Sequence, residues 1–242
     1  ILQVVINPYL TACDVKNTQP VQRLNIGGSA NSVGTTLAPF FVTGIVFGGL
    51  SMEEVNISQI QVSFLGLMAV FAVVTLVLSR MKLPDIKGTK AESGEKLEKS
   101  VWSFSHLTMG VLGIFFYVGV EVCVGANINL YAIELEKAGR QFLFFGMDSL
   151  TIGGINFAIP ALMATLYWGG MLIGRLISSS LSKIPPQTQL AVAAVLAAAS
   201  TVGAIVADNP WLLVAVGLFH SVMWGSIFTL AINRLGKYTS VA

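Results

Sequence analysis

Apolar residues fill this 242-residue chain in long, nearly uninterrupted stretches. A helix that crosses a membrane needs about 20 consecutive, mostly apolar residues. The pattern predicts spans at Leu24–Leu50, Ile60–Ser79, Phe104–Ala132, Ile155–Leu181, Leu190–Ala207 and Trp211–Leu235. A further apolar stretch, Ile1–Ala12, is too short to span, and we interpret it as the second half of a helix. The expected fold class is therefore all-α, a polytopic membrane protein that forms part of a larger bundle.

Composition agrees with a lipid bilayer as the surrounding medium. Hydrophobic residues make up 54% of the chain, charged residues make up 11%, and the mean hydropathy is +0.76. A soluble domain carries about 25% charged residues. The net charge of +2, without a basic patch that contains interleaved aromatics, gives no reason to expect a nucleic-acid partner.

The basic residues fix an expected orientation. If the loops alternate between the two sides, all 14 Lys and Arg residues except Lys137 and Arg140 fall on one side. The positive-inside rule places that side in the cytoplasm. We therefore expect an inner-membrane protein with cytoplasmic loops at 13–23, 80–103 and 182–189 and extracytoplasmic loops at 50–60, 133–157 and 207–211.

A polar, mixed-charge segment at 83–103 predicts a cytoplasmic linker that separates an N-terminal part, 1–82, from a C-terminal part, 104–242. Small residues recur every fourth position at Gly170, Gly174 and Ser178. Such stripes let membrane helices approach closely, and we interpret this one as a packing surface.

Glu121 is the most informative residue of the chain. It lies in the middle of a predicted span, with no other acid or base within ten residues on either side. An ionisable group at this depth is costly, and it is tolerated mainly where it faces a bundle interior or a water-filled cavity. Gly119, Gly125 and the Asn127–Asn129 segment predict a broken helix beyond it, as in many transporter binding sites. Glu121 is thus the candidate proton-coupling group, with a structural pair to His220 or to an Asn as the alternative.

Other polar side chains inside the predicted spans suit a neutral, polyhydroxylated solute. Amides offer both donors and acceptors, and aromatic rings with a polar tip fit the face of a sugar ring. An anionic solute would need a cation at mid-depth, and none is expected, since Arg175 lies near the inner end of its helix. Each position has helix packing as its alternative. The candidate substrate-binding residues are Gln3, Asn7, Asn31, Tyr117, Glu121, Asn127, Asn129, His220 and Trp224.

Three stretches resemble the fucose/glucose–galactose–proton symporter family of the major facilitator superfamily. They are Asn7-Pro8-Tyr9-Leu10-Thr11, Tyr117-Val118-Gly119-Val120-Glu121-Val122 and Gly217-Leu218-Phe219-His220-Ser221-x-Met223. The resemblance implies a partial bundle, from about half of the fourth helix to the tenth of twelve. It also implies a central sugar site and transport by alternating access.

The resemblance also separates branches of the family. Gln3 stands where the fucose transporter has its coupling carboxylate, whereas the glucose/galactose branch has Gln there and a Glu matching Glu121. Asn31 matches a sugar-contacting Asn. Gly28, His220 and the Trp224-Gly225 pair depart from the family pattern, so the sugar and the coupling ion, proton or sodium, stay open.

The expected function is therefore symport of a hexose, such as glucose, galactose or fucose, with a proton. No cofactor and no metal site are expected, and the full-length protein is expected to work as a monomer. The sequence contains no HExxH or GxSxG motif, so it gives no indication of an intramembrane enzyme. The alternatives are a major facilitator transporter of another polar solute or drug, or a membrane sensor on a transporter scaffold.

Overall fold

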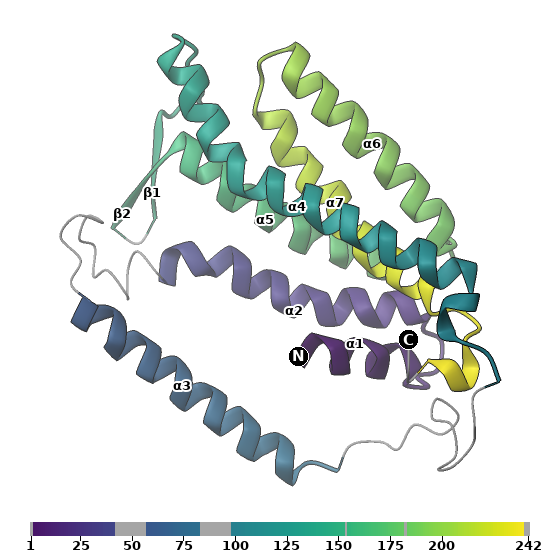
Figure 1. Cartoon of the computed structure of the whole chain (residues 1–242). Coiled ribbons are helices and arrows are strands. Elements are labelled where there is room, and N and C mark those ends of the chain that lie inside the picture. The colour runs from purple at the N-terminus through teal and green to yellow at the C-terminus, as the bar shows by residue number, and fades with distance from the viewer. Residues whose placement is uncertain (1, 42–56, 83–97, 153, 182, 240–242) are drawn as a thin grey trace.

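The computed structural model describes residues 2–41, 57–82, 98–152, 154–181 and 183–239 (Figure 1). Within these ranges the chain forms long helices and one short hairpin. The elements are α1 (Leu2–Ala12), α2 (Pro20–Phe41), α3 (Ile57–Arg80), η2 (Val101–Ser103), α4 (Ser105–Lys137), β1 (Ser149–Ile152), β2 (Ile155–Ala158), α5 (Ile159–Ser180), α6 (Pro186–Val206), α7 (Trp211–Ala231) and η3 (Gly236–Tyr238).

In the described part of the chain, α3, α4, α5, α6 and α7 are long and apolar enough to cross a membrane. This confirms a multi-pass helical membrane protein. The helix predicted at Leu24–Leu50 begins at Pro20 and is described as far as Phe41, so the rest of that prediction lies outside the described residues. Most of the predicted linker, 83–97, lies outside them too.

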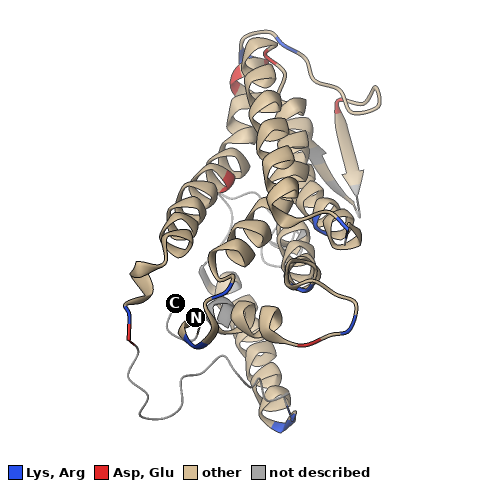
Figure 2. Cartoon of the chain, turned by 90° about the vertical axis from the view of Figure 1, so that its right-hand side faces the viewer, with Lys and Arg blue, Asp and Glu red and all other residues tan. Residues whose placement is uncertain are grey.

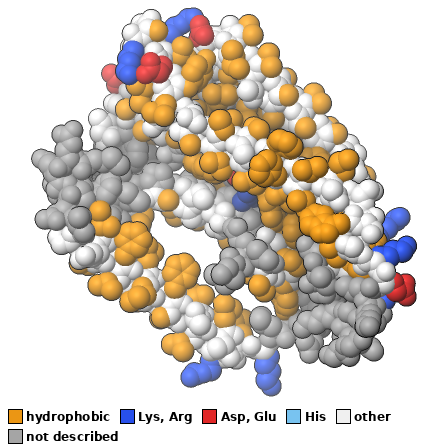
Figure 3. Space-filling model, viewed as in Figure 1, with side chains coloured by type: hydrophobic (Ala, Val, Ile, Leu, Met, Phe, Trp, Pro, Cys, Tyr) orange, Lys and Arg blue, Asp and Glu red, His pale blue; other side chains and the backbone are white. Residues whose placement is uncertain are grey.

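Helix α7 is the centre of the packing, because it contacts α2, α4, α5 and α6, while α5 also packs on α2 and α4. Met163, Tyr167 and Met171 of α5 are buried against Ile128 of α4 and Val216 of α7. Helix α3 lies differently, with nearly all its described side chains exposed (Figure 3). Figure 2 shows Lys, Arg, Asp and Glu residues mainly at helix ends and in loops, as expected for helices that cross a membrane.

Small residues form the contact between α5 and α7, as the stripe predicts. A Cβ at Gly170 would lie 3.3 Å from the backbone nitrogen of Leu218, and one at Gly174 would overlap the Leu218 carbonyl oxygen. From the other side, a Cβ at Gly217 would overlap the backbone of Tyr167. The two backbones therefore touch without intervening side chains.

The helix predicted to begin at Ile155 begins four residues later, at Ile159, because residues 155–158 form a strand. The two strands pair antiparallel, from Ser149 opposite Ala158 to Ile152 opposite Ile155. Gly154 takes φ +83° in the connecting turn, and Pro160 sits in the first turn of α5, where a proline needs no backbone donor.

The predicted break beyond Glu121 is wrong, since α4 is one continuous helix of 33 residues. The reason for Gly125 is contact rather than a break: a Cβ there would lie 2.6 Å from Cζ2 of Trp168. Asn127 stays within the helix, where its side-chain amide donates to the carbonyl of Cys123 at 2.8 Å. Helix α4 also continues to Lys137, so the loop predicted at 133–157 starts later than expected.

The ends of α4, α6 and α7 near this loop are connected by side chains. Nη2 of Arg140 lies 2.9 Å from a carboxylate oxygen of Asp208, which follows α6. Phe144 stacks on Trp211, the first residue of α7, with ring centroids 5.7 Å apart. We refer to the segment 138–158 as the outer strap.

Candidate functional site

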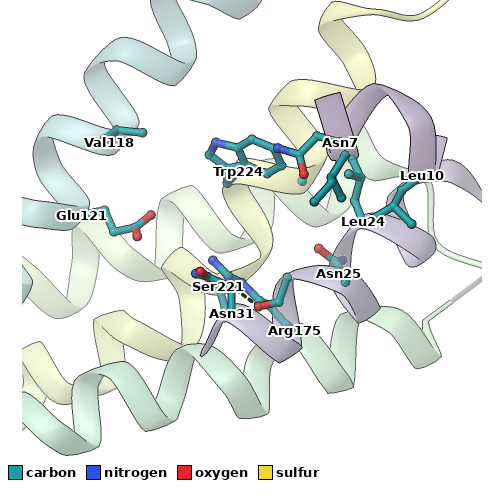
Figure 4. A pocket seen from close by; sticks show the side chains of 14 residues that line it. Asn7, Leu10, Leu24, Asn25, Asn31, Val118, Glu121, Arg175, Ser221 and Trp224 are labelled. Carbon is teal, nitrogen blue, oxygen red and sulfur yellow. Dashed lines mark hydrogen bonds between the residues drawn. The ribbon is translucent and has the colours of Figure 1, made fainter. Parts of the chain in front are cut away.

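A cavity of about 400 Å³ lies between α1, α2, α4, α5 and α7 (Figure 4). Small-molecule sites usually measure about 300–1,000 Å³. Its wall mixes apolar side chains with a few polar ones that converge from different helices. The polar lining consists of Asn7, Asn25, Asn31, Glu121, Arg175, Ser221 and Trp224.

Glu121 reaches this cavity from α4, and its carboxylate faces the space between the helices (Figure 4). The side chain is half-buried. Among the described residues, ion pairs within 4.0 Å are Lys137–Glu134 and Arg140–Asp208, both exposed. The structural alternative does not hold in the form of an ion pair between Glu121 and His220. Glu121 faces a polar cavity and forms no ion pair within 4.0 Å in the described part of the chain.

Three other predicted residues line the same cavity. Asn7 comes from α1, Asn31 from α2 and Trp224 from α7. The Trp224 ring stacks on Phe228 one turn later, with centroids 5.1 Å apart and planes 10° apart. This contact holds one face of the indole and leaves the ring at the cavity wall. The structure thus brings together residues that are more than 200 positions apart in the sequence.

Tyr117 and His220 lie behind the cavity wall, outside its lining, and both are buried. The Tyr117 hydroxyl donates to the His220 carbonyl at 2.8 Å. The Tyr167 hydroxyl donates to the Glu121 carbonyl at 3.0 Å and lies 2.9 Å from Nδ1 of His220. A hydroxyl has one hydrogen, so this pair of bonds requires that Nδ1 carries the hydrogen. The network fixes the Glu121 backbone to α5 and α7.

Asn127 and Asn129 do not line the cavity. Asn127 is exposed, and its amide is bonded within α4. Asn129 has a buried side-chain oxygen without a hydrogen-bond partner in the described part of the chain. Gln3 lies on α1, and its side chain is outside the described residues.

Replacing Tyr167 with Phe is expected to destabilise the full-length protein by about 1–3 kcal/mol, because the imidazole and the Glu121 carbonyl would both lose a buried partner. Thermal unfolding of the purified protein in detergent measures this. Tyr131→Phe is the matched control, since that hydroxyl makes one longer bond, 3.4 Å, to the Ala204 carbonyl. Equal stability of the two variants would contradict the structural role of Tyr167.

Arg175 is the charged cavity residue that the sequence did not reveal, beside Asn25 and Ser221, and the expectation of no cation at this depth is wrong. Its Nη1 donates to the Gly28 carbonyl and to Oγ of Ser32, both at 2.7 Å. A Cβ at position 28 would lie 3.4 Å from that nitrogen, so Gly28 lets the guanidinium lie close to the α2 backbone. A glycine facing an arginine across two helices gives no signal in a single sequence.

The described part of the chain offers no candidate metal site. Within the described residues, no group of three or more His, Cys, Asp or Glu is placed to hold a metal ion.

The comparisons with known proteins agree with the geometry of the fold and its cavity. No family model matches the chain. It is 33% identical over 246 residues to a glucose/galactose transporter of Brucella abortus, covering 99% of this chain and 56% of that protein. It is 32% identical over 253 residues to a putative glucose/galactose transporter of Helicobacter pylori, covering 100% of this chain and 57% of that protein. The chain therefore spans somewhat more than half the length of the curated relatives it matches.

Solved structures decide the fold. The chain superposes on the major facilitator superfamily transporter FucP in its outward conformation with a TM-score of 0.76, at 20% identity, over 99% of this chain and 60% of that one. A second structure, of the E. coli fucose:proton symporter FucP, gives a TM-score of 0.73 at 21% identity. The chain has the major facilitator fold. Together with the curated relatives, this major facilitator match confirms the resemblance carried by the three sequence stretches.

Proposed function

We propose that the chain is the central part of a sugar–proton symporter that works by alternating access. One observation carries the proposal: a polar cavity between the two expected parts of the chain, with amides from α1 and α2 on one side and a carboxyl and an indole from α4 and α7 on the other. In alternating access, two halves rock about such a site. The names of the curated relatives support a hexose, and that of the structural neighbour supports a proton.

The sugar would bind between the two parts, 1–82 and 104–242. Asn7 and Asn31 would exchange hydrogen bonds with adjacent hydroxyls, because an amide supplies both a donor and an acceptor. Trp224 would cover one apolar face of the ring. We assign Tyr117 and His220 to the support of the cavity wall rather than to direct contact.

Glu121 would carry the coupling proton. It is the carboxyl on the cavity lining, and water entering the cavity would give it a route for exchange. No cofactor and no covalent chemistry form part of the proposal. The protein would act as a monomer in the inner membrane. Its loops 13–23, 80–103 and 182–189 would lie in the cytoplasm, an orientation that the distribution of basic residues supports.

Sugar uptake into proteoliposomes of the full-length protein tests the proposal. We expect glucose, galactose or fucose to compete with a labelled hexose, and Asn31→Ala to weaken the competition about tenfold through the loss of hydrogen bonds to the solute. Asn127→Ala is the matched control, since that amide is exposed and bonded within its own helix. Absence of competition by every sugar would contradict the proposal.

A second candidate comes from Arg175, whose guanidinium on the cavity suits an anionic solute. Sugar acids therefore belong in the same competition panel. Competition by sugar acids alone would favour this candidate, and binding of a solute without flux would favour a sensor.

A further inference from the structure

The cavity contains two charged residues of opposite sign among its described lining, Glu121 and Arg175. They do not form an ion pair within 4.0 Å. Both belong to the same part of the chain, on α4 and α5, yet the guanidinium is bonded to α2. This leaves a half-buried carboxyl on the same cavity as a cation whose bonds are to neutral acceptors.

Arg175 belongs to a line of polar contacts between α2 and α5, which we call the α2–α5 seam. Gln22 donates its amide to the carbonyl of Ser179 at 2.6 Å. Asn25 donates to Oγ of Ser178 at 2.7 Å. The two hydrogen bonds of Arg175 continue this line toward the cavity. Among these contacts of the seam, they are the bonds that involve a charged side chain. The seam joins the two expected halves of the bundle.

Resting on the proposed symport, we propose that Arg175 is the positioning residue that connects the proton on Glu121 to the α2–α5 seam. With Glu121 protonated, Arg175 keeps its bonds to Gly28 and Ser32. When the proton leaves to water in the cavity, the carboxylate competes for the guanidinium. Charge-assisted hydrogen bonds are about twice as strong as those between neutral partners. Arg175 then turns to Glu121, and the seam loses its bonds at the cavity.

The other described titratable groups around Glu121 do not provide a fixed positive charge for its carboxylate. From α4 the neighbouring titratable group is Tyr117, and from α5 it is Tyr167, whose hydroxyl is bonded to the Glu121 carbonyl. From α7 it is His220, whose Nδ1 is bonded to Tyr167. The lining residues of α1 and α2 carry no charge. Arg175 is thus the fixed cation available to the carboxylate among the described lining.

Charge-neutralising variants of the full-length protein in proteoliposomes test the inference, with sugar exchange measured at equal pH on both sides. Arg175→Gln is expected to lower sugar exchange more than about tenfold, because it leaves the half-buried Glu121 carboxylate without a cation. Arg175→Gln combined with Glu121→Gln is expected to recover exchange to about the level of Glu121→Gln alone. Lys183→Gln is the control, an exposed cation just beyond α5. A double variant as poor as Arg175→Gln would overturn the inference.

A second measurement does not depend on the folding of an Arg175 variant. After correction for the intrinsic pH dependence of amide exchange, hydrogen exchange in peptides from residues 20–41 of the wild-type protein is expected to become about threefold to tenfold faster as Glu121 deprotonates. In Glu121→Gln this pH dependence should disappear, while peptides from α6 behave alike in both proteins. A pH dependence that persists in Glu121→Gln would overturn the inference. Absence of sugar flux through the wild-type protein would instead contradict the proposed symport. The comparison of amide hydrogen exchange between the wild type and Glu121→Gln would still decide the role of Arg175.

Discussion

Glu121→Gln is expected to reduce solute-driven proton movement to the level of vesicles without protein. Gln keeps the size of the side chain and its hydrogen-bonding capacity but cannot gain or lose a proton. Exchange of sugar across the membrane should survive, because the cavity keeps its shape and its amides. The measurement is the change of internal pH when sugar is added to proteoliposomes of the full-length protein, wild type against variant.

Glu134→Gln is the matched control for this experiment. Glu134 lies on the same helix but is exposed, in an ion pair with Lys137 at 2.8 Å. Exposed pairs of this kind contribute about 0–1 kcal/mol, so proton movement should stay at the wild-type level. Proton movement that persists in Glu121→Gln would assign coupling to another group and remove Glu121 from the mechanism.

Gly217→Ala is expected to be strongly destabilising at the α5–α7 contact. The added Cβ would overlap the carbonyl oxygen of Tyr167, and a backbone atom cannot turn aside as a flexible side chain can. Overpacking of this kind costs about 1–3 kcal/mol or more, against a gain in helix propensity of about 1 kcal/mol. We expect a thermal midpoint several degrees lower for the full-length protein in detergent.

Gly119→Ala provides the comparison, because a Cβ at Gly119 meets no atom within 4 Å. This variant keeps the propensity gain without a clash, so it should be as stable as the wild type or slightly more so. If both variants unfold at the same temperature, the close approach of α5 and α7 has no energetic importance.

The spans were predictable because their length is set by the bilayer rather than by local sequence detail. Trp211 was correctly identified as the start of α7. The error at Ile155 arose because the apolar strand Ile155–Ala158 runs directly into an apolar helix, and periodicity does not separate the two. The error at Gly125 arose because a glycine that breaks a helix and one that admits a neighbouring ring look alike in one sequence.

The candidate site was predictable where a polar side chain has no reason to be in an apolar helix. This argument identified Asn7, Asn31, Glu121 and Trp224, which share one cavity. It did not separate them from His220, because facing a cavity or facing a partner helix depends on the rotation of each helix in the bundle. Arg175 was missed because depth along a helix does not give the direction of a long side chain.

The outer strap has a practical consequence for anyone who follows the motion of this protein with attached probes. Arg140–Asp208 and Phe144–Trp211 join the strap to the beginning of α7 and to the residues after α6. A fluorophore or spin label on the strap should therefore report the displacement of helices α4–α7 as a group rather than local motion of the loop. Paired with a second label on α2, it would test the proposed rocking of the two parts against each other.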